Sequence, residues 1–407
     1  MQSDIKRLIE NFFSLSLLKL CNLILPLVTL PYLIKTLSVG TYGVIVMSLS
    51  IAMYFQTLIE YGFNLSATRD IARNRENKRR LDLIYSKVII SKIFLLIISL
   101  ILLYVVLMFL PNFNENRLTY ILIGLILIGY AIFPEWFFRG VEEMRYIALL
   151  DFTVKISFTI GVFLFIKSES ELWLYPAMLG GAYIIVSVIS HFIILTRFKV
   201  KFKLVKLTCI KKTLIKTFPL FVNQFFPNLY NNTTTFLVGL ILGNYAVGVY
   251  GAIKQIVSAL NVFNSVSTTV LYPYLNRNKH HFKKFSKFYL IVLFLISLMF
   301  ILISGPILSY LNIDDSNSVI IFSILVFGVF NIGVYSVFST NYLLTYNKDR
   351  LVMKVTIFTS VIGFILSFPL IYFSGLLGAA INVFFCQLLL ASISFVFYIK
   401  HRKLIDL

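Results

Sequence analysis

The chain has 407 residues, of which 59% are hydrophobic and 13% are charged, and its formal net charge is +20. So few charged residues exclude an ordinary soluble domain, in which about a quarter of the residues are charged. The positive charge does not indicate nucleic-acid binding, because it lies in short segments between apolar stretches, where it would face an anionic membrane surface.

Twelve apolar stretches follow one another along the chain. Each is long enough for a helix that crosses about 30 Å of hydrocarbon. The first is too long for the core of a signal peptide, so we expect it to be retained as a helix. The sequence therefore predicts an all-α integral membrane protein with twelve transmembrane helices, at residues 12–35, 41–63, 88–110, 118–138, 147–166, 173–196, 218–242, 245–273, 288–310, 319–345, 353–373 and 376–399.

Basic residues gather at one side of these stretches. The two termini and every second connection hold 30 of the 37 Lys and Arg residues, whereas the other connections hold only Lys35, Arg117 and Lys167. Since connections rich in Lys and Arg remain on the cytoplasmic side of a membrane, both termini are predicted to be cytoplasmic.

The outward connections are short, none of them longer than about eight residues. They leave no room for a folded extracytoplasmic domain. The sequence also has no glycine-rich phosphate loop, no paired metal-binding motif and no Ser/His/Asp set, and its three cysteines predict no disulfide framework. We therefore expect a protein without metal, cofactor or enzyme activity, whose function is carried out between its helices.

A basic segment at 197–217 separates the first six stretches from the last six. We expect an N-terminal six-helix bundle at 1–196, a basic cytoplasmic linker at 197–217 and a C-terminal six-helix bundle at 218–407. Because six is even, both bundles would enter from the cytoplasm and would be parallel repeats about an axis along the membrane normal. Transporters built in this way hold a central cavity that opens to each side in turn.

The two halves begin alike. In each, a helix with two prolines leads into a glycine-containing segment, Leu37–Val44 in the first half and Leu242–Val249 in the second. A shift of 205 residues aligns these segments and places Gly43 opposite Gly248. Prolines within the stretches permit either static packing kinks or bends that line a wet cavity; they are Pro26, Pro31, Pro134, Pro219 and Pro227.

Polar residues recur at helical spacing on several stretches. Such stripes either join helices by hydrogen bonds or line a water-filled cavity. Several polar residues in register, with a lysine among them, favour the cavity. We expect the sugar-facing set to be Asn223, Asn231, Ser258, Asn261, Ser265, Asn331 and Tyr335.

Some charged residues inside the stretches have a partner nearby in sequence. Glu135 and Arg139 are four residues apart, as are Asp151 and Lys155, so each pair can neutralise itself on one helix face. Lys92 is predicted to extend to the nearby cytoplasmic surface, as is His191.

Lys19 and Lys254 have no acidic residue three or four positions away. An unpaired ammonium group inside a bilayer costs from about 3 to more than 10 kcal/mol, so it needs water or an anion. We therefore expect both lysines to face a cavity that accepts a negatively charged substrate.

Two strings carry a resemblance to a known family. Residues 61–72 (YGFNLSATRDIA) end the second stretch and residues 134–146 (PEWFFRGVEEMRY) end the fourth. Both resemble the bacterial O-antigen and polysaccharide repeat-unit flippases, which belong to the multidrug/oligosaccharidyl-lipid/polysaccharide exporter superfamily. The predicted topology is similar over the whole chain, whereas the second half matches mainly by pattern, as at 243–250 (GNYAVGVY).

The resemblance implies a transporter of an oligosaccharide joined by pyrophosphate to undecaprenol. It would move this substrate from the cytoplasmic to the periplasmic leaflet of the bacterial inner membrane, for lipopolysaccharide or other surface-polysaccharide synthesis. Implied partners are this lipid-linked oligosaccharide and membrane lipids, with the O-antigen polymerase and the chain-length regulator as candidate protein partners.

The resemblance also gives roles to charged residues. The pyrophosphate suits Lys19 and Lys254, and Arg69 and Arg139 in the two matching strings would meet it at the cytoplasmic mouth. An arginine in the position of Arg69 is more often simply an orientation charge. Three carboxylates are candidates for handling protons or counter-ions if a gradient drives transport: Glu60, Glu135 and Asp151.

Three other classes compete with this interpretation. A drug or cation antiporter of the same superfamily would have an acidic or aromatic cavity, whereas the unpaired charges within these stretches are positive. A polymerase or ligase would need longer extracytoplasmic loops for its acceptor. A structural scaffold would not need polar stripes in lipid. A flippase is therefore favoured, with another transporter as the alternative.

Overall fold

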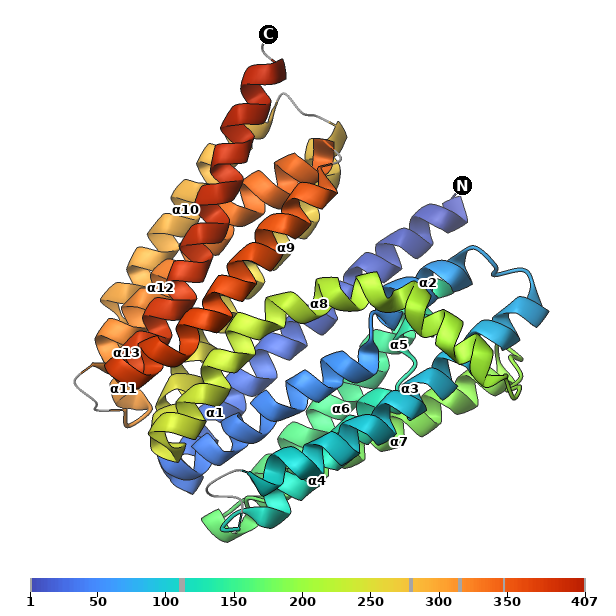
Figure 1. Ribbon diagram of the computed structural model, residues 1–407, viewed down its shortest axis with the longest axis horizontal. Helices are drawn as coiled ribbons and strands as arrows, with labels where there is room; N and C mark the ends of the chain where they lie inside the picture. Colours follow the sequence, from blue (N-terminus) through green and yellow to red (C-terminus); the bar gives the residue numbers. More distant parts are fainter. Residues whose placement is uncertain (1, 110–113, 278–280, 314–316, 347, 406–407) are drawn as a thin grey trace. The chain divides into compact units, whose positions relative to one another are not determined.

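The computed structural model describes residues 2–109, 114–277, 281–313, 317–346 and 348–405, with side chains except at 2–20, 266, 269–274, 276–277 and 402–405. Every regular element in these ranges is a helix (Figure 1). The first half contains α1 (Gln2–Glu60), α2 (Phe63–Ala72), α3 (Lys78–Met108), α4 (Arg117–Ile132), α5 (Glu135–Gly140), α6 (Met144–Phe165), η1 (Glu169–Glu171) and α7 (Leu174–Thr196). The second half contains α8 (Leu207–Leu242), α9 (Asn244–Arg277), α10 (Phe282–Leu302), α11 (Ser304–Tyr310), α12 (Ser318–Tyr335), η3 (Ser336–Leu343), η4 (Leu344–Tyr346) and α13 (Asp349–Ile405).

Nine helical segments of the described chain are long and apolar enough to cross a membrane. Seven of them have 21 to 31 residues, and two, Cys21–Ala72 and Asp349–His401, have 52 and 53 residues. These lengths confirm the predicted class, an all-α multi-pass membrane protein. The count of twelve crossings stays a prediction.

Each of the two longest helices contains one residue outside the helical conformation. In α1 this residue is Ser38, with φ 62° and ψ 162°. In α13 it is Gly375, with φ 58° and ψ −137°. A positive φ is strained for serine but accessible to glycine. Both helices therefore contain a break that divides them into two shorter segments.

The chain forms two compact units. Unit 1 comprises residues 1–32 and 48–225, and unit 2 comprises residues 33–47 and 226–407. In unit 1, α4 packs against both α3 and α7, α6 packs against α7, and α2 packs against α5 (Figure 1). In unit 2, α12 packs against α9, α10 and α13. The division into domains at 1–196, 197–217 and 218–407 stays a prediction.

Part of the basic segment 197–217 is held on α3 within unit 1. The carboxylate of Asp82 accepts hydrogen bonds from the backbone N–H of Lys201 and from the Lys203 ammonium group, both at 2.8 Å. One turn further along α3, the Ser86 hydroxyl accepts from the backbone N–H of Lys203, also at 2.8 Å. Residues two apart on the extended segment thus bind residues four apart on the helix. This is possible because two residues of an extended chain and four residues of a helix both span about 6 to 7 Å.

Gly43 and Gly248 lie against each other within unit 2. A Cβ atom on Gly43 would overlap the carbonyl oxygen of Asn244, and a Cβ atom on Gly248 would overlap the carbonyl oxygen of Val39. The 205-residue shift equates Val39 with Asn244 as well as Gly43 with Gly248, so the contact is reciprocal. Such reciprocity is expected of equivalent segments related by a two-fold axis. The contact therefore supports the internal duplication.

The helix breaks at this crossing are equivalent too. The same shift equates Ser38 with Gly243, and these residues have φ values of 62° and 87°. Each of these residues separates two helical segments, and the second segment begins four residues before the glycine contact. The two segments therefore match in local conformation as well as in sequence.

Candidate functional site

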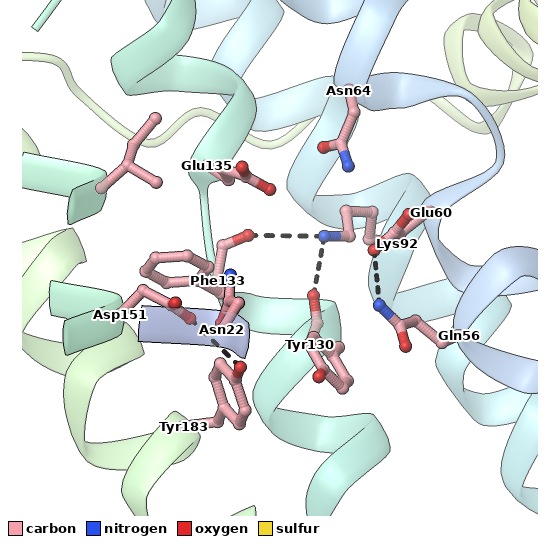
Figure 2. Close-up of a pocket in the computed structure, with 11 residues that line it drawn as sticks. Asn22, Gln56, Glu60, Asn64, Lys92, Tyr130, Phe133, Glu135, Asp151 and Tyr183 are labelled. Atoms are coloured by element: carbon pink, nitrogen blue, oxygen red, sulfur yellow. Dashed lines mark hydrogen bonds between the residues drawn. The ribbon is translucent and has the colours of Figure 1, made fainter. Parts of the chain in front are cut away.

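A polar cavity of about 140 Å³ lies inside unit 1 (Figure 2). Seven helices, α1 to α7, and the interruption between α4 and α5 contribute side chains to it. The lining is rich in amide, carboxyl, ammonium and phenol groups, from Asn22, Gln56, Glu60, Asn64, Lys92, Tyr130, Phe133, Glu135, Ile147, Asp151 and Tyr183. This concentration of polar groups among apolar helices makes the cavity the candidate functional site.

The interruption between α4 and α5 creates part of this lining. Phe133 has an extended backbone with ψ 117°, and Pro134 has no N–H group to donate. Carbonyl groups of the last turn of α4 are therefore left without helical partners. In a membrane such groups need a donor from elsewhere in the protein.

Lys92 of α3 supplies this donor. Its ammonium group donates to the carbonyl oxygen of Tyr130 at 2.8 Å and lies 3.5 Å from that of Phe133 (Figure 2). Only 2% of Lys92 is exposed. The prediction that Lys92 extends to the cytoplasmic surface is therefore wrong, because the broken helix offers its ammonium group a nearer set of oxygens.

His191 of α7 binds the same interruption. Its Nε2 lies 2.9 Å from the carbonyl oxygen of Ile132, and its Nδ1 forms a hydrogen bond with the hydroxyl of Tyr85. A carbonyl can only accept, so Nε2 carries a proton, and Nδ1 of the neutral ring accepts from Tyr85. The interruption is thus held by two side chains. Sequence reasoning missed both, although Pro134 signalled carbonyl groups in need of donors.

Three carboxylates predicted to handle protons or counter-ions line the one cavity. Glu60 accepts a hydrogen bond from the Gln56 amide at 3.0 Å. Glu135 forms an ion pair with Arg139 at 2.5 Å, as the spacing of four residues permitted. Their coupling role stays a prediction, but the fold brings them together from α1, α5 and α6.

The third carboxylate is the least satisfied. Asp151 accepts from the Tyr183 hydroxyl at 3.2 Å through Oδ1. Its Oδ2 is buried and has no hydrogen-bond partner among the described residues. Asn22 of α1 lies beside it (Figure 2). An open acceptor on a buried carboxylate suits a proton, a cation or a hydroxyl group.

The two strings that carried the family resemblance meet in space. The Thr68 hydroxyl of α2 donates to the carbonyl oxygen of Trp136 in α5, at 3.1 Å. A Cβ atom on Gly140 would lie 2.6 Å from the side chain of Ile71, so the helices approach closely only because this residue is glycine. Arg75 then donates to the Gly140 carbonyl oxygen at 3.1 Å. The strings therefore form one packed corner next to the cavity.

The arginines predicted at the cytoplasmic mouth have different surroundings. Arg69 is exposed in the last turn of α2. Arg139 is engaged with Glu135, and its Nε has no hydrogen-bond partner among the described residues. Neither position tests the predicted contact with pyrophosphate.

In unit 2, Lys254 is held by neutral oxygens. Its ammonium group donates to the carbonyl oxygen of Asn231 at 2.8 Å and to the hydroxyl of Thr235 at 2.9 Å. Both acceptors belong to α8. The positive charge of Lys254 is therefore solvated by the protein without being neutralised by these contacts. The side chain of Lys19 lies outside the described residues.

The remaining predicted sugar-facing residues are spread over both units. Asn223 is exposed in unit 1, and Ser265 is exposed in unit 2. Ser258 donates to the carbonyl oxygen of Gln255 at 2.6 Å, a bond within its own helix. Within the predicted set, Asn261 Oδ1 and Asn331 Nδ2 are buried and have no hydrogen-bond partner among the described residues. The Tyr335 hydroxyl forms a hydrogen bond with that of Thr356 at 3.2 Å.

Asn264, next to the predicted stripe on α9, is the residue that joins helices. Its side-chain amide donates to the carbonyl oxygen of Val329 at 3.1 Å and accepts from the Tyr289 hydroxyl. Only 2% of Asn264 is exposed. Sequence reasoning missed it because it lies outside the helical spacing of three and four residues that relates Ser258, Asn261 and Ser265.

Over nearly its whole length the chain is similar to proteins named for O-antigen transport, and most of it matches a polysaccharide biosynthesis family. A family model described as "Polysaccharide biosynthesis protein" matches residues 8–279. An Escherichia coli (strain K12) protein named "Putative O-antigen transporter" is 27% identical, with 97% of each chain covered. A Shigella dysenteriae protein of the same name is 25% identical, with 94% of this chain and 97% of that one covered.

Solved structures share the fold at lower identity. One is described as an inward-facing multidrug resistance MATE family transporter of the MOP superfamily, with a TM-score of 0.69, 14% identity and coverage of 93% of this chain and 95% of that one. Another is "Lipid II flippase MurJ, inward closed conformation", with a TM-score of 0.67, 19% identity and coverage of 97% and 87%.

Proposed function

The chain belongs to the polysaccharide biosynthesis protein family, and from that premise we propose that it flips undecaprenyl-pyrophosphate-linked O-antigen repeat units. The substrate would pass from the cytoplasmic to the periplasmic leaflet of a bacterial inner membrane, for synthesis of lipopolysaccharide or another surface polysaccharide. The observation that carries this proposal is similarity along 97% of the chain to a protein named as an O-antigen transporter. Nothing in the proposal requires a covalent step, a cofactor or a metal.

We propose twelve membrane crossings in two six-helix bundles with both termini in the cytoplasm. A helix of 52 residues is about 78 Å long, more than twice the hydrocarbon thickness of about 30 Å. The breaks at Ser38 and Gly375 divide α1 and α13 into segments that each fit one crossing. The two breaks raise the nine apolar segments to eleven crossings, and α8 supplies the twelfth. The bundles would be 1–196 and 218–407, joined by 197–217.

Alternating access would expose the substrate site to each leaflet in turn. The pyrophosphate would bind Lys19 and Lys254, with Arg69 and Arg139 as earlier contacts. Lys254 supports this role, because neutral oxygens hold its ammonium group while its charge remains available. The saccharide would contact the polar stripes, while the lipid chain remains in the membrane.

The carboxylates of the unit 1 cavity would handle a proton or counter-ion. Three acidic side chains and one lysine line the cavity, so acid is in excess there. That excess also favours a second candidate, an antiporter of cationic compounds. The two candidates differ in what they transport: a flippase moves a lipid-linked saccharide, whereas an antiporter moves a soluble cation.

The deciding experiment follows the cargo itself. Purified protein in vesicles would receive a fluorescent undecaprenyl-pyrophosphate oligosaccharide on one leaflet, and its appearance in the other would be measured with and without a pH gradient. We expect transfer above that of empty vesicles. Transfer at the background rate, together with exchange of a cationic dye for protons, would establish the antiporter instead.

A further inference from the structure

An apolar groove of about 660 Å³ lies within unit 1, beside the first turns of α8. One wall consists of two rows of α8 side chains at four-residue spacing, Leu207, Lys211 and Ile215 in one row and Ile210, Leu214 and Phe218 in the other. Tyr61 lines it from the junction of α1 and α2, and Phe94 lines it from α3. The wall is about 17 Å long, from the helical rise of 1.5 Å per residue.

The wall is anchored, so the groove is formed before any ligand arrives. On α8, the Lys216 ammonium group lies 3.2 Å from the Asp70 carboxylate of α2. The Thr217 hydroxyl bonds to that of Ser66 at 3.4 Å. One turn further on, Phe221 stacks on the ring of Tyr61 with centroids 4.7 Å apart. These contacts hold the amphipathic start of α8 against α2.

One cation accompanies the apolar lining. Lys211 is exposed, lines the groove and forms no ion pair with a carboxylate in the described part of the chain. Its neighbour Lys212 is also exposed but does not line the groove. A preformed apolar site with one free cation fits a long hydrocarbon chain that carries an anionic group.

Two consecutive residues line the polar cavity and the groove. Glu60 lines the cavity and Tyr61 lines the groove. Tyr61 has φ 44° and Gly62 has φ 76°, so the backbone turns sharply between α1 and α2 at this point.

We propose that this groove binds the chain of a polyisoprenyl phosphate lipid, with Lys211 beside its phosphate. The inference rests on the proposed function, which supplies an isoprenoid substrate. The groove volume of about 660 Å³ is large enough for several isoprene units, since a cavity of about 150 Å³ is enough for a benzene ring. An anchored wall and a Lys211 that is unpaired with any carboxylate among the residues that the structure describes favour this specific ligand over bulk membrane lipid, which requires neither feature.

The test uses photochemical labelling of the full chain in vesicles of phosphatidylethanolamine and phosphatidylglycerol. The probe is a polyisoprenyl phosphate with a diazirine in its chain, and labelled peptides are located by mass spectrometry. We expect labelling at 207–218 that unlabelled polyisoprenyl phosphate suppresses and additional phosphatidylglycerol does not. Equal suppression by both lipids would assign the groove to bulk lipid and overturn the proposal.

Matched variants locate the site. Leu214→Trp fills the groove and should reduce labelling about tenfold, whereas Leu195→Trp, on an exposed face of α7 outside the groove, should not. Lys211→Gln should weaken competition by the phosphate lipid, and Lys212→Gln should leave it unchanged. Unaltered labelling in Leu214→Trp, with normal elution of the protein as a single species, would exclude the groove.

The fluorescent transfer assay separates this inference from the proposed function. Transfer of the lipid-linked oligosaccharide without labelling of the groove would overturn the groove assignment and leave the proposed function in place. Specific labelling of the groove without transfer would support the binding site and overturn the flippase.

Discussion

Gly43 and Gly248 lie against each other, and each approaches the backbone of the segment that carries the other. Residues 205 apart in sequence thus occupy equivalent places at one crossing. Since neither position has space for a Cβ atom, the requirement for glycine is imposed by the partner segment. The crossing gives the sequence repeat a physical basis that a match of common residues lacks.

Substitution at this crossing should destabilise the protein. In Gly43→Ala the new methyl group meets backbone atoms of Asn244, which cannot rotate away, so we expect a loss of about 1–3 kcal/mol. Gly40 has open space around it, so Gly40→Ala is the control, with unchanged or slightly raised stability. Thermal unfolding in detergent measures both, and equal melting temperatures would contradict the close approach.

Lys92 should be required for both stability and transport. Lys92→Met leaves the carbonyl groups of Tyr130 and Phe133 without their donor, at a cost of about 1–3 kcal/mol for a buried acceptor. Lys87→Met on the same helix removes only a partly exposed pair with Asp70 and should have a smaller effect. Thermal unfolding and the transfer assay are the measurements, and similar losses in both variants would refute the role assigned to Lys92.

The cavity carboxylates should determine the response to a pH gradient. Asp151→Asn keeps an acceptor for the Tyr183 hydroxyl but cannot exchange a proton, so we expect insertion to be normal and stimulation of transport by the gradient to be lost. Glu60→Gln should behave in the same way. Glu169→Gln, in an exposed turn, serves as control. Full stimulation in Asp151→Asn would remove this residue from the coupling.

Lys254 should act through its charge. Lys254→Gln can still donate hydrogen bonds toward the oxygens of Asn231 and Thr235, yet it carries no charge for a phosphate, so transfer should fall at least about tenfold with little change in melting temperature. Lys400→Gln, exposed near the end of α13, is the matched control. A melting temperature that falls as far as transport does would indicate a structural role instead.

Proteolysis can test the contacts that bind the basic segment 197–217 to α3. Asp82→Ala removes the acceptor of the Lys201 N–H and the Lys203 ammonium group, so trypsin should cut after these lysines faster. Glu76→Ala, in the exposed turn before α3, should not change the rate. Cleavage of the Asp82→Ala protein at the original rate would mean that other contacts hold this segment.

The class of fold was predictable from sequence because hydrophobic length and the placement of basic residues report directly on a membrane. The grouping of Glu60, Glu135 and Asp151 was only partly predictable: each was recognised as a buried carboxylate, but nothing local indicates that α1, α5 and α6 bring them to one cavity. Their convergence depends on tertiary packing between distant helices.

For Lys92 the prediction from sequence was wrong, because the side chain is buried and does not extend to the surface. Its place near a helix end suggested an extended side chain, and only the break at Pro134, about forty residues later in the sequence, provides the carbonyl oxygens that keep it buried. Asn264 was missed for a related reason, because its partners lie on α10 and α12. A stripe pattern on one helix does not identify which side chain another helix will contact.

Residues 33–47 belong to unit 2 although the rest of that unit begins at residue 226. During synthesis this segment leaves the ribosome long before Asn244, whose backbone it packs against, has been made. Its glycine-lined face must therefore be covered by lipid or by the insertion machinery until the later helices arrive. Biogenesis of the second unit is thus tied to the first, and a gene divided within the basic segment would encode two fragments, of which the second lacks a piece of its own packing.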